Sequence, residues 1–258
     1  MASAPCNPNT RHKRDDMSRF LNQPTLEADF LAPVRTSSDV TGSAIDGGRN
    51  GLGETLAIEM SGGGVVSATY EDCMIKNPEH YEYVNWLGAR LNGGFRFINV
   101  PIITDWFGPF PKLPKLPTPI IRGIPHSDGS LFTDTSGYSQ ATVYGEVVED
   151  AALNAGILKM KVYGLSRPLR WSDWFSIYHV SRGWRAYRYW DVLAVTDEPT
   201  PVYTLAISPP LREATAAGTR VEFARPRFVA KFKSDFTLPS VVEAFFVTRQ
   251  TIQFVEAF

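Results

Sequence analysis

Short segments of alternating apolar and polar residues, separated by turn residues, fill the second half of the chain from 141 to 233. In the clearest, 157–163, Leu158, Met160 and Val162 fall on one face of a strand. Further strands are predicted at 141–149, 174–180, 186–195, 202–208, 219–224 and 227–232. Strands at such short intervals are typical of an antiparallel barrel or sandwich. The sequence therefore predicts a mainly β fold with a minor helical part.

One amphipathic helix is predicted near 77–92. Asn77 is a favourable N-cap, and Pro78 suits the first helical position. Three apolar residues recur with helical spacing: Val84, Leu87 and Leu91. The glycine pair at 93–94 ends the segment. Such a helix packs one face on a sheet, and a strand is expected directly after it, at 95–103.

Two further regions are rich in turn residues or less regular. Residues 36–64 hold many Gly, Ser and Asp residues and are interpreted as long loops and hairpin turns around one short strand, 56–60, with a ligand-binding loop as the alternative. Residues 240–256 are predicted to form one more pair of strands, with a short helix as the alternative.

The domain organisation follows from changes in composition along the chain. Residues 1–19 are polar and are expected to form a flexible N-terminal arm. Residues 20–107 form a β/α region, and 108–130 form a proline-rich connector whose spacing of prolines excludes helix. Residues 131–258 form the C-terminal β-barrel or sandwich region. The alternative is one domain in which 20–107 and 131–258 are intertwined.

Charge and hydrophobicity exclude several classes of protein. The 26 basic and 27 acidic residues give a net charge of -1, so the chain as a whole has no basic field for nucleic acid or lipid. With 43% hydrophobic residues it is not a disordered protein. No apolar run approaches the roughly 18 residues of a membrane span. We therefore expect a soluble protein without a membrane span.

Motifs that carry chemistry are absent from the sequence. It contains no phosphate-binding glycine loop, no HExxH zinc motif and no GxSxG nucleophile elbow. Its two cysteines, Cys6 and Cys73, do not form a CxxC pair, and Cys73 is interpreted as structural. The sequence accordingly predicts no catalytic residues, no cofactor and no metal, and the chain is expected not to be an enzyme.

Aromatic residues are densest between 171 and 190, where Arg182, Arg185 and Arg188 lie among them and Arg170 directly precedes them. Aromatic residues and arginine are enriched in protein interfaces, which favours a core on one face and a subunit contact on the other. A platform that stacks on sugar rings and one that stacks on single-stranded nucleic acid are the alternatives. The candidate contact residues are Trp171, Trp174, Trp184, Tyr187 and Trp190, together with the 108–125 segment.

Three stretches, 164–177, 207–214 and 218–226, carry a resemblance to a known family. Together they resemble the C-terminal half of distal tail proteins, which tailed bacteriophages and prophages use to join the tail tube to the tip or baseplate. The resemblance is clearest over 160–232, vaguer over 70–110, and does not cover 1–35 or the connector. These motifs mark turns and strand ends, so no catalytic residue is carried over from the family.

The resemblance implies a role in assembly. A distal tail protein has a β-barrel domain that closes into a homo-oligomeric ring, commonly a hexamer. That ring stacks on the tail-tube protein and on a hub, tip or baseplate protein, and DNA passes its channel only as cargo. The resemblance thus implies a non-enzymatic structural protein of the virion tail, made and folded in the cytoplasm of the bacterial host.

Three other functions remain open from the sequence. The first is a carbohydrate-binding module on a phage tip, supported by the aromatic cluster. The second is an enzyme that acts on the host surface, such as a glycoside hydrolase or esterase. The third is another part of the virion, namely a tail-tube, neck or decoration protein. Function here depends on position within an assembly, which a motif does not encode.

Overall fold

The computed structural model describes residues 19–42, 44–59, 62–103, 128, 130–133, 143–165, 167–196, 200–241 and 248–258. Residues 1–18 of the expected N-terminal arm and nearly all of the proline-rich connector lie outside these ranges. The described chain consists mostly of antiparallel strands, with one long helix and one short helix. The expected mainly β class is therefore confirmed. No helix among the described residues is long and apolar enough to cross a membrane.

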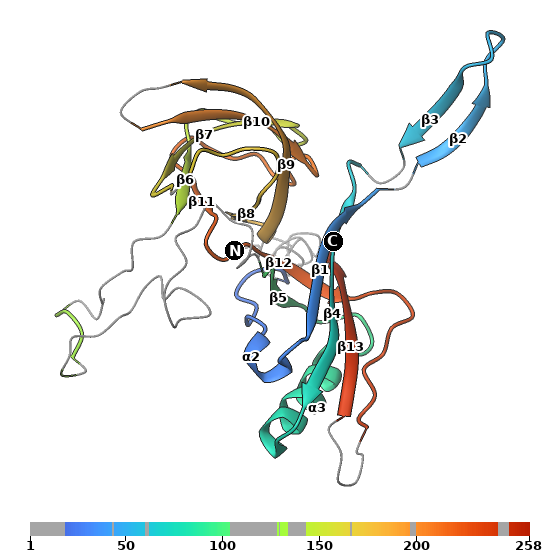
Figure 1. Cartoon of the computed structure of the whole chain (residues 1–258), viewed down its shortest axis with the longest axis vertical. Helices are drawn as coiled ribbons and strands as arrows, with labels where there is room; N and C mark the ends of the chain where they lie inside the picture. Colours follow the sequence, from blue (N-terminus) through green and yellow to red (C-terminus); the bar gives the residue numbers. More distant parts are fainter. Residues whose placement is uncertain are drawn as a thin grey trace, which may run out of the picture.

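The first part of the fold is a closed barrel of six antiparallel strands, in the order β10-β7-β6-β11-β8-β9 (Figure 1). Their bounds are β6 Tyr144–Val147, β7 Ile157–Tyr163, β8 Trp174–His179, β9 Gly183–Thr196, β10 Val202–Ser208 and β11 Arg220–Glu222. The alternation predicted for β7 is confirmed, because Leu158, Met160 and Val162 are all buried. They pack in the barrel interior with Phe175 and Phe223.

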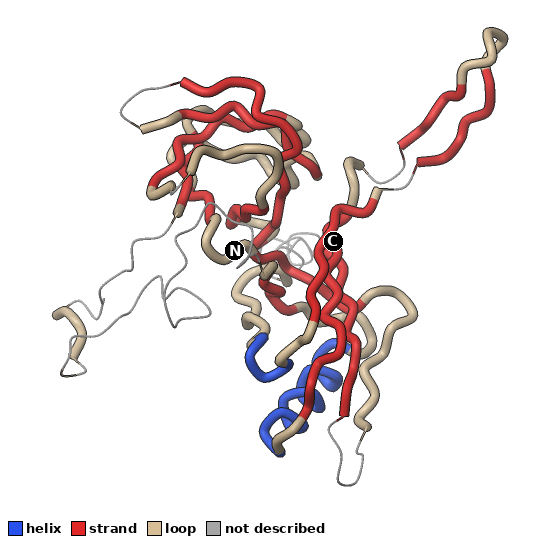
Figure 2. The backbone as a smooth tube through the Cα atoms, in the orientation of Figure 1, coloured by secondary structure: helices blue, strands red, loops and turns tan. Residues whose placement is uncertain are grey.

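The second part is a five-stranded sheet in the order β1-β4-β13-β12-β5. Its strands are β1 Arg35–Thr41, β4 Val65–Ile75, β5 Ile98–Pro101, β12 Arg227–Phe232 and β13 Thr248–Glu256. Helix α3, Pro78–Leu91, confirms the predicted helix, and the short helix α2, Ala28–Leu31, packs beside it (Figure 2).

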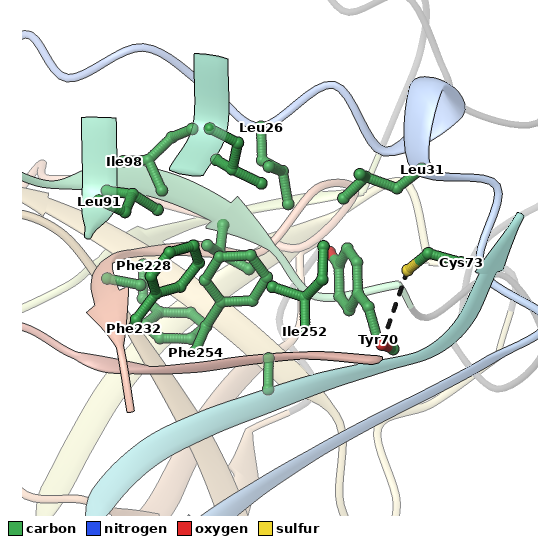
Figure 3. Close-up of a cluster of buried hydrophobic side chains, with 14 of the residues drawn as sticks. Leu26, Leu31, Tyr70, Cys73, Leu91, Ile98, Phe228, Phe232, Ile252 and Phe254 are labelled. Atoms are coloured by element: carbon green, nitrogen blue, oxygen red, sulfur yellow. Dashed lines mark hydrogen bonds between the residues drawn. The ribbon is translucent and has the colours of Figure 1, made fainter. Parts of the chain in front are cut away.

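The core of this second part lies between the helices and the sheet. Val84, Leu87 and Leu91 of α3 are buried, as their spacing predicts. Figure 3 shows Leu91 near Ile98 on one side of this core, with the aromatic rings of β12 and β13 on the other. Asn77 has the extended backbone of an N-cap, but its side chain makes no capping hydrogen bond.

The chain leaves the five-stranded sheet after β5, builds the barrel, and returns to the same sheet as β12. Strands β5 and β12 are direct neighbours in that sheet, with Val100 opposite Phe228. Residues 131–258 are thus distributed over both parts of the fold: β6 to β11 form the barrel, and β12 and β13 complete the sheet. At the C-terminal end, one strand, β13, covers 248–256, and residues 242–247 lie outside the described ranges.

A third element is a two-stranded hairpin formed by β2, Ala44–Arg49, and β3, Thr55–Glu59. Strand β3 agrees with the strand expected at 56–60, whereas β1 and β2 lie where loops and turns were expected. Figure 1 shows this hairpin running outward from the end of β1, away from both the barrel and the sheet. Within the described ranges, no other layer of the chain therefore lies against the hairpin (Figure 1).

Candidate interaction surface

An open hollow of about 420 Å³ lies where the barrel meets β1. We call it the Trp171–Trp190 hollow, after the two exposed tryptophans in its wall. Its lining comes from β1, from the loop between β7 and β8, and from the strands β9 and β10: Val40, Trp171, Ser172, Arg188, Trp190 and Ser208. Its volume falls within the range of about 300–1,000 Å³ typical of pockets that hold ligands.

Trp171 stands out in both backbone and exposure. Its φ is 63°, in the left-handed region that a bulky residue rarely adopts, and 80% of its side chain is exposed. The guanidinium of Arg170 lies 5.2 Å from the centre of its ring. A strained residue costs on the order of 1–3 kcal/mol and is found most often where a side chain has a function. In this strained backbone conformation the large apolar ring of Trp171 lies exposed on the surface.

Arg188 supplies the positive charge of the hollow. Its Nε donates a hydrogen bond of 2.6 Å to Ser172 Oγ, and its Nη1 lies 3.9 Å from Asp39 Oδ1 of β1. The guanidinium also lies 5.7 Å from the ring of Trp174. Arg188 is thereby oriented, while its side chain stays 42% exposed. The hollow combines apolar rings with an oriented cation.

The five predicted contact residues occupy different surroundings. Trp171 and Trp190 are exposed in the wall of the hollow, the latter to 63%. Trp174 is buried in the core of the sheet part, and Tyr187 is fully buried inside the barrel. Trp184 is half-buried, with the guanidinium of Arg227 over its ring at 4.2 Å. Only Trp171 and Trp190 present most of their rings to a partner.

Buried polar residues that no sequence motif indicates join the barrel to the sheet. Glu256, near the end of β13, accepts hydrogen bonds from Arg185 Nη1 at 3.1 Å and Arg212 Nη2 at 3.3 Å. Arg185 and Glu256 have side chains with no exposed surface. Burial lowers the pKa of Arg185, and the Glu256 carboxylate opposes this effect. We call these three residues the junction cluster. The sequence could have indicated it, because Glu256 and Arg185 are charged residues at strand positions where the alternation predicts buried apolar side chains.

Tyr187 extends this polar network into the barrel. Its hydroxyl lies 2.7 Å from His179 Nε2 and accepts a hydrogen bond of 3.1 Å from the backbone N–H of Arg212. Burial lowers the pKa of His179 to about 4. The histidine is therefore neutral near pH 7, and this contact serves the fold.

The junction cluster also fixes the base of the β2–β3 hairpin. Arg212 donates to the carbonyl oxygens of Gly62 and Gly64, and Ser208 Oγ donates to that of Gly63 at 3.3 Å. The backbone passes so close that a Cβ at Gly63 would lie 2.0 Å from Cδ of Pro210. Glycine is required there, and the hairpin base is held against the barrel.

Two observations concern chemistry. Across the described ranges, no three His, Cys, Asp or Glu side chains are placed to hold a metal ion. Cys73 is a free, fully buried thiol in the sheet core, and burial raises its pKa to about 12 (Figure 3). A thiol with such a pKa is protonated near neutral pH and has little nucleophilic character.

Comparison with known proteins adds no family to these observations. The chain matches no protein-family model, and the search of curated proteins finds no match either.

Proposed function

We propose that this chain is a non-enzymatic structural protein of a bacteriophage virion, a distal tail component. In this role several copies form a ring, commonly of six, that joins the tail tube to the tip or baseplate. The proposal starts from the resemblance of 160–232 to that family. Most of those residues lie in the barrel and the last few form β12 of the sheet, and a barrel of this kind is compatible with the belt domain of such a ring.

The observation that carries the proposal is the β2–β3 hairpin. An isolated two-stranded hairpin is marginally stable in water. This one extends away from its own chain (Figure 2), and the described side chains from Ile45 to Glu54 are exposed or, at Asn50, half-buried. Its base is nevertheless held by the contacts of Arg212 and Ser208. A fixed base and an uncovered hairpin are expected of an element that packs on a neighbouring molecule.

The Trp171–Trp190 hollow gives a second argument for assembly. Tryptophan and arginine are the residues most often found at the energetic centre of protein interfaces. Here two exposed tryptophans and Arg188 line the same hollow. The further partners proposed are the tail-tube protein on one face of the ring and a hub, tip or baseplate protein on the other. DNA passes as cargo, and the location is the virion tail.

The native mass of the purified protein tests this proposal. Six copies of the 28.7 kDa chain form a closed ring of about 172 kDa. Light scattering should give that mass, and negative-stain images of the same peak should show a central hole. A closed ring of another size would favour another virion part, such as a tail-tube, neck or decoration protein. A monomer at every concentration examined, with no ring in the images, would contradict the proposal.

A second candidate is a carbohydrate-binding module, because two exposed tryptophan rings line one hollow. Flat rings of this kind stack on sugar faces, and the hydroxyls of Ser172 and Ser208 in the wall can form hydrogen bonds. A glycan screen, followed by titration of tryptophan fluorescence, separates the two functions. Saturable binding that is lost in Trp190→Ala would favour the carbohydrate function.

A further inference from the structure

We infer that the Trp171–Trp190 hollow of one copy receives the tip of the β2–β3 hairpin of the next copy, with Leu52 as the inserted side chain. This inference rests on the proposed function, because it requires the chain to associate with itself. It specifies which two surfaces of the chain meet.

The tip of the hairpin is a well-defined turn. Asn50 Oδ1 accepts hydrogen bonds from the backbone N–H groups of Leu52 and Glu54, both at 3.0 Å. The Asn50 carbonyl accepts another from the N–H of Gly53 at 2.9 Å, and Asn50 N–H donates to the Glu54 carbonyl at 2.9 Å. On this ordered turn the Leu52 side chain is 86% exposed. An ordered apolar tip loses little conformational entropy when it binds.

The hairpin does not reach the hollow of its own chain. Strands β2 and β3 pair with each other, from Ala44 opposite Glu59 at the base to Arg49 opposite Thr55 near the tip. Val40, in the wall of the hollow, belongs to β1 and precedes the hairpin, whereas Leu52 lies in the turn between β2 and β3. Figure 1 shows that turn at the far end of the hairpin, away from the barrel. A contact between tip and hollow therefore joins two copies. Such head-to-tail contacts generate a ring when the rotation between copies closes.

The two surfaces complement each other in chemistry. Val40 and the rings of Trp171 and Trp190 offer an apolar wall to Leu52. Glu54, two residues along the turn, is exposed and has one carboxylate oxygen held at 2.8 Å by Asn50 Nδ2. Arg188 brings a cation to the wall of the hollow, where the Asp39 carboxylate of β1 lies 3.9 Å from it. With Leu52 seated against these rings, the Glu54 carboxylate would lie near the Arg188 guanidinium. That attraction would favour one orientation of the hairpin tip in the hollow.

Cross-linking in a Cys6→Ser background tests the contact directly, because Cys73 is fully buried and does not compete. Leu52→Cys and Ser172→Cys in one chain, treated with a short bismaleimide, should give a ladder of covalent oligomers up to the closed ring. The matched control pairs Leu52→Cys with Val180→Cys, which is 82% exposed and does not line the hollow. It should give no ladder.

A second variant tests the same contact without a cross-link. Leu52→Asp places a charge on an exposed tip and leaves the backbone hydrogen bonds of the turn in place, so the chain should fold. Its native mass should fall about sixfold, from hexamer to monomer, whereas Leu52→Met should keep the mass of the ring.

The outcomes separate the inference from the proposed function. Suppose that both the wild-type protein and Leu52→Asp form rings, and that the cross-linking gives no ladder. The proposed ring then stands, and the contact between Leu52 and the hollow is wrong. If the wild-type protein forms no ring, both fail. Saturable glycan binding in the hollow, without any ladder, also overturns the inference.

Discussion

Arg185 of the barrel and Glu256 of the five-stranded sheet form an ion pair with an N–O distance of 3.1 Å and no exposed side-chain surface. The same guanidinium donates to the carbonyl of Ala257 and lies 5.7 Å from the ring of Phe258. A buried ion pair adds little net stability when intact, but removing one partner leaves a charge buried alone. Glu256 is the ion-pair partner of both Arg185 and Arg212, so removing its charge affects both arginines of the junction cluster.

Glu256→Gln should therefore lower the free energy of unfolding by about 3–5 kcal/mol, because it leaves the charges of Arg185 and Arg212 without a counterion. Urea unfolding at neutral pH measures the change. The matched control is Glu71→Gln, which breaks a surface pair with Arg35 whose side chain is 76% exposed, and should cost less than about 1 kcal/mol. Equal losses in the two variants would show that the junction cluster does not hold the barrel on the sheet.

The base of the hairpin gives a second prediction. Gly63→Ala adds a Cβ 2.0 Å from Cδ of Pro210 at a φ of 89°, so strain and overpacking combine. We expect a loss of about 2–4 kcal/mol in the free energy of unfolding, and faster proteolysis of the hairpin. Gly53→Ala is the control: its φ is 83°, but the added Cβ meets open space, so about 1–2 kcal/mol is expected. A smaller loss at Gly63 than at Gly53 would contradict the close contact.

His179 makes stability depend on pH. Burial lowers its pKa from 6.5 to about 4 in the folded chain. Between these pH values the unfolded chain binds a proton at His179 that the folded chain does not. The neutral histidine therefore makes its full contribution to folding stability above pH 6.5. As the pH falls to 4, this contribution is lost, by up to about 3 kcal/mol. In His179→Gln the loss of unfolding free energy between pH 7 and 4 should be smaller by that amount. Identical pH profiles would refute the prediction.

The sequence predicts the elements whose burial follows from local periodicity. Helix α3 and strand β7 bury the residues that their spacing indicates, and β12 matches its expected bounds. Strand β1 was missed because it lies at the edge of the sheet with alternating exposure and mostly polar residues. Strand β1 is held in the sheet by its antiparallel backbone pairing with β4, and residue composition does not reveal such pairing.

The candidate surface was harder to predict, for a reason visible in β9. Alternation shows that Tyr187 and Tyr189 share one face of the strand, and both lie in the barrel core. The opposite face is covered by the sheet at Ala186 and uncovered at Trp190. Which part of an outward face another layer covers depends on tertiary packing, and a single sequence does not encode it locally. The cluster of aromatics was therefore identified, and its division into core and surface was not.

Trp171 offers the sharpest test of the hollow, because stability and association should change in opposite directions. Asparagine adopts the left-handed backbone more readily than a bulky residue. Trp171→Asn should therefore raise the free energy of unfolding by roughly 1 kcal/mol, since the backbone at φ 63° is relieved and an 80% exposed ring contributes little packing. The same change should weaken self-association, measured by light scattering over a dilution series. Trp174→Asn, in the buried core, should instead lose stability. A loss of stability in Trp171→Asn would mean that the indole ring of Trp171 stabilises the fold by packing. It would then contradict the view that the hollow is a surface for binding another molecule.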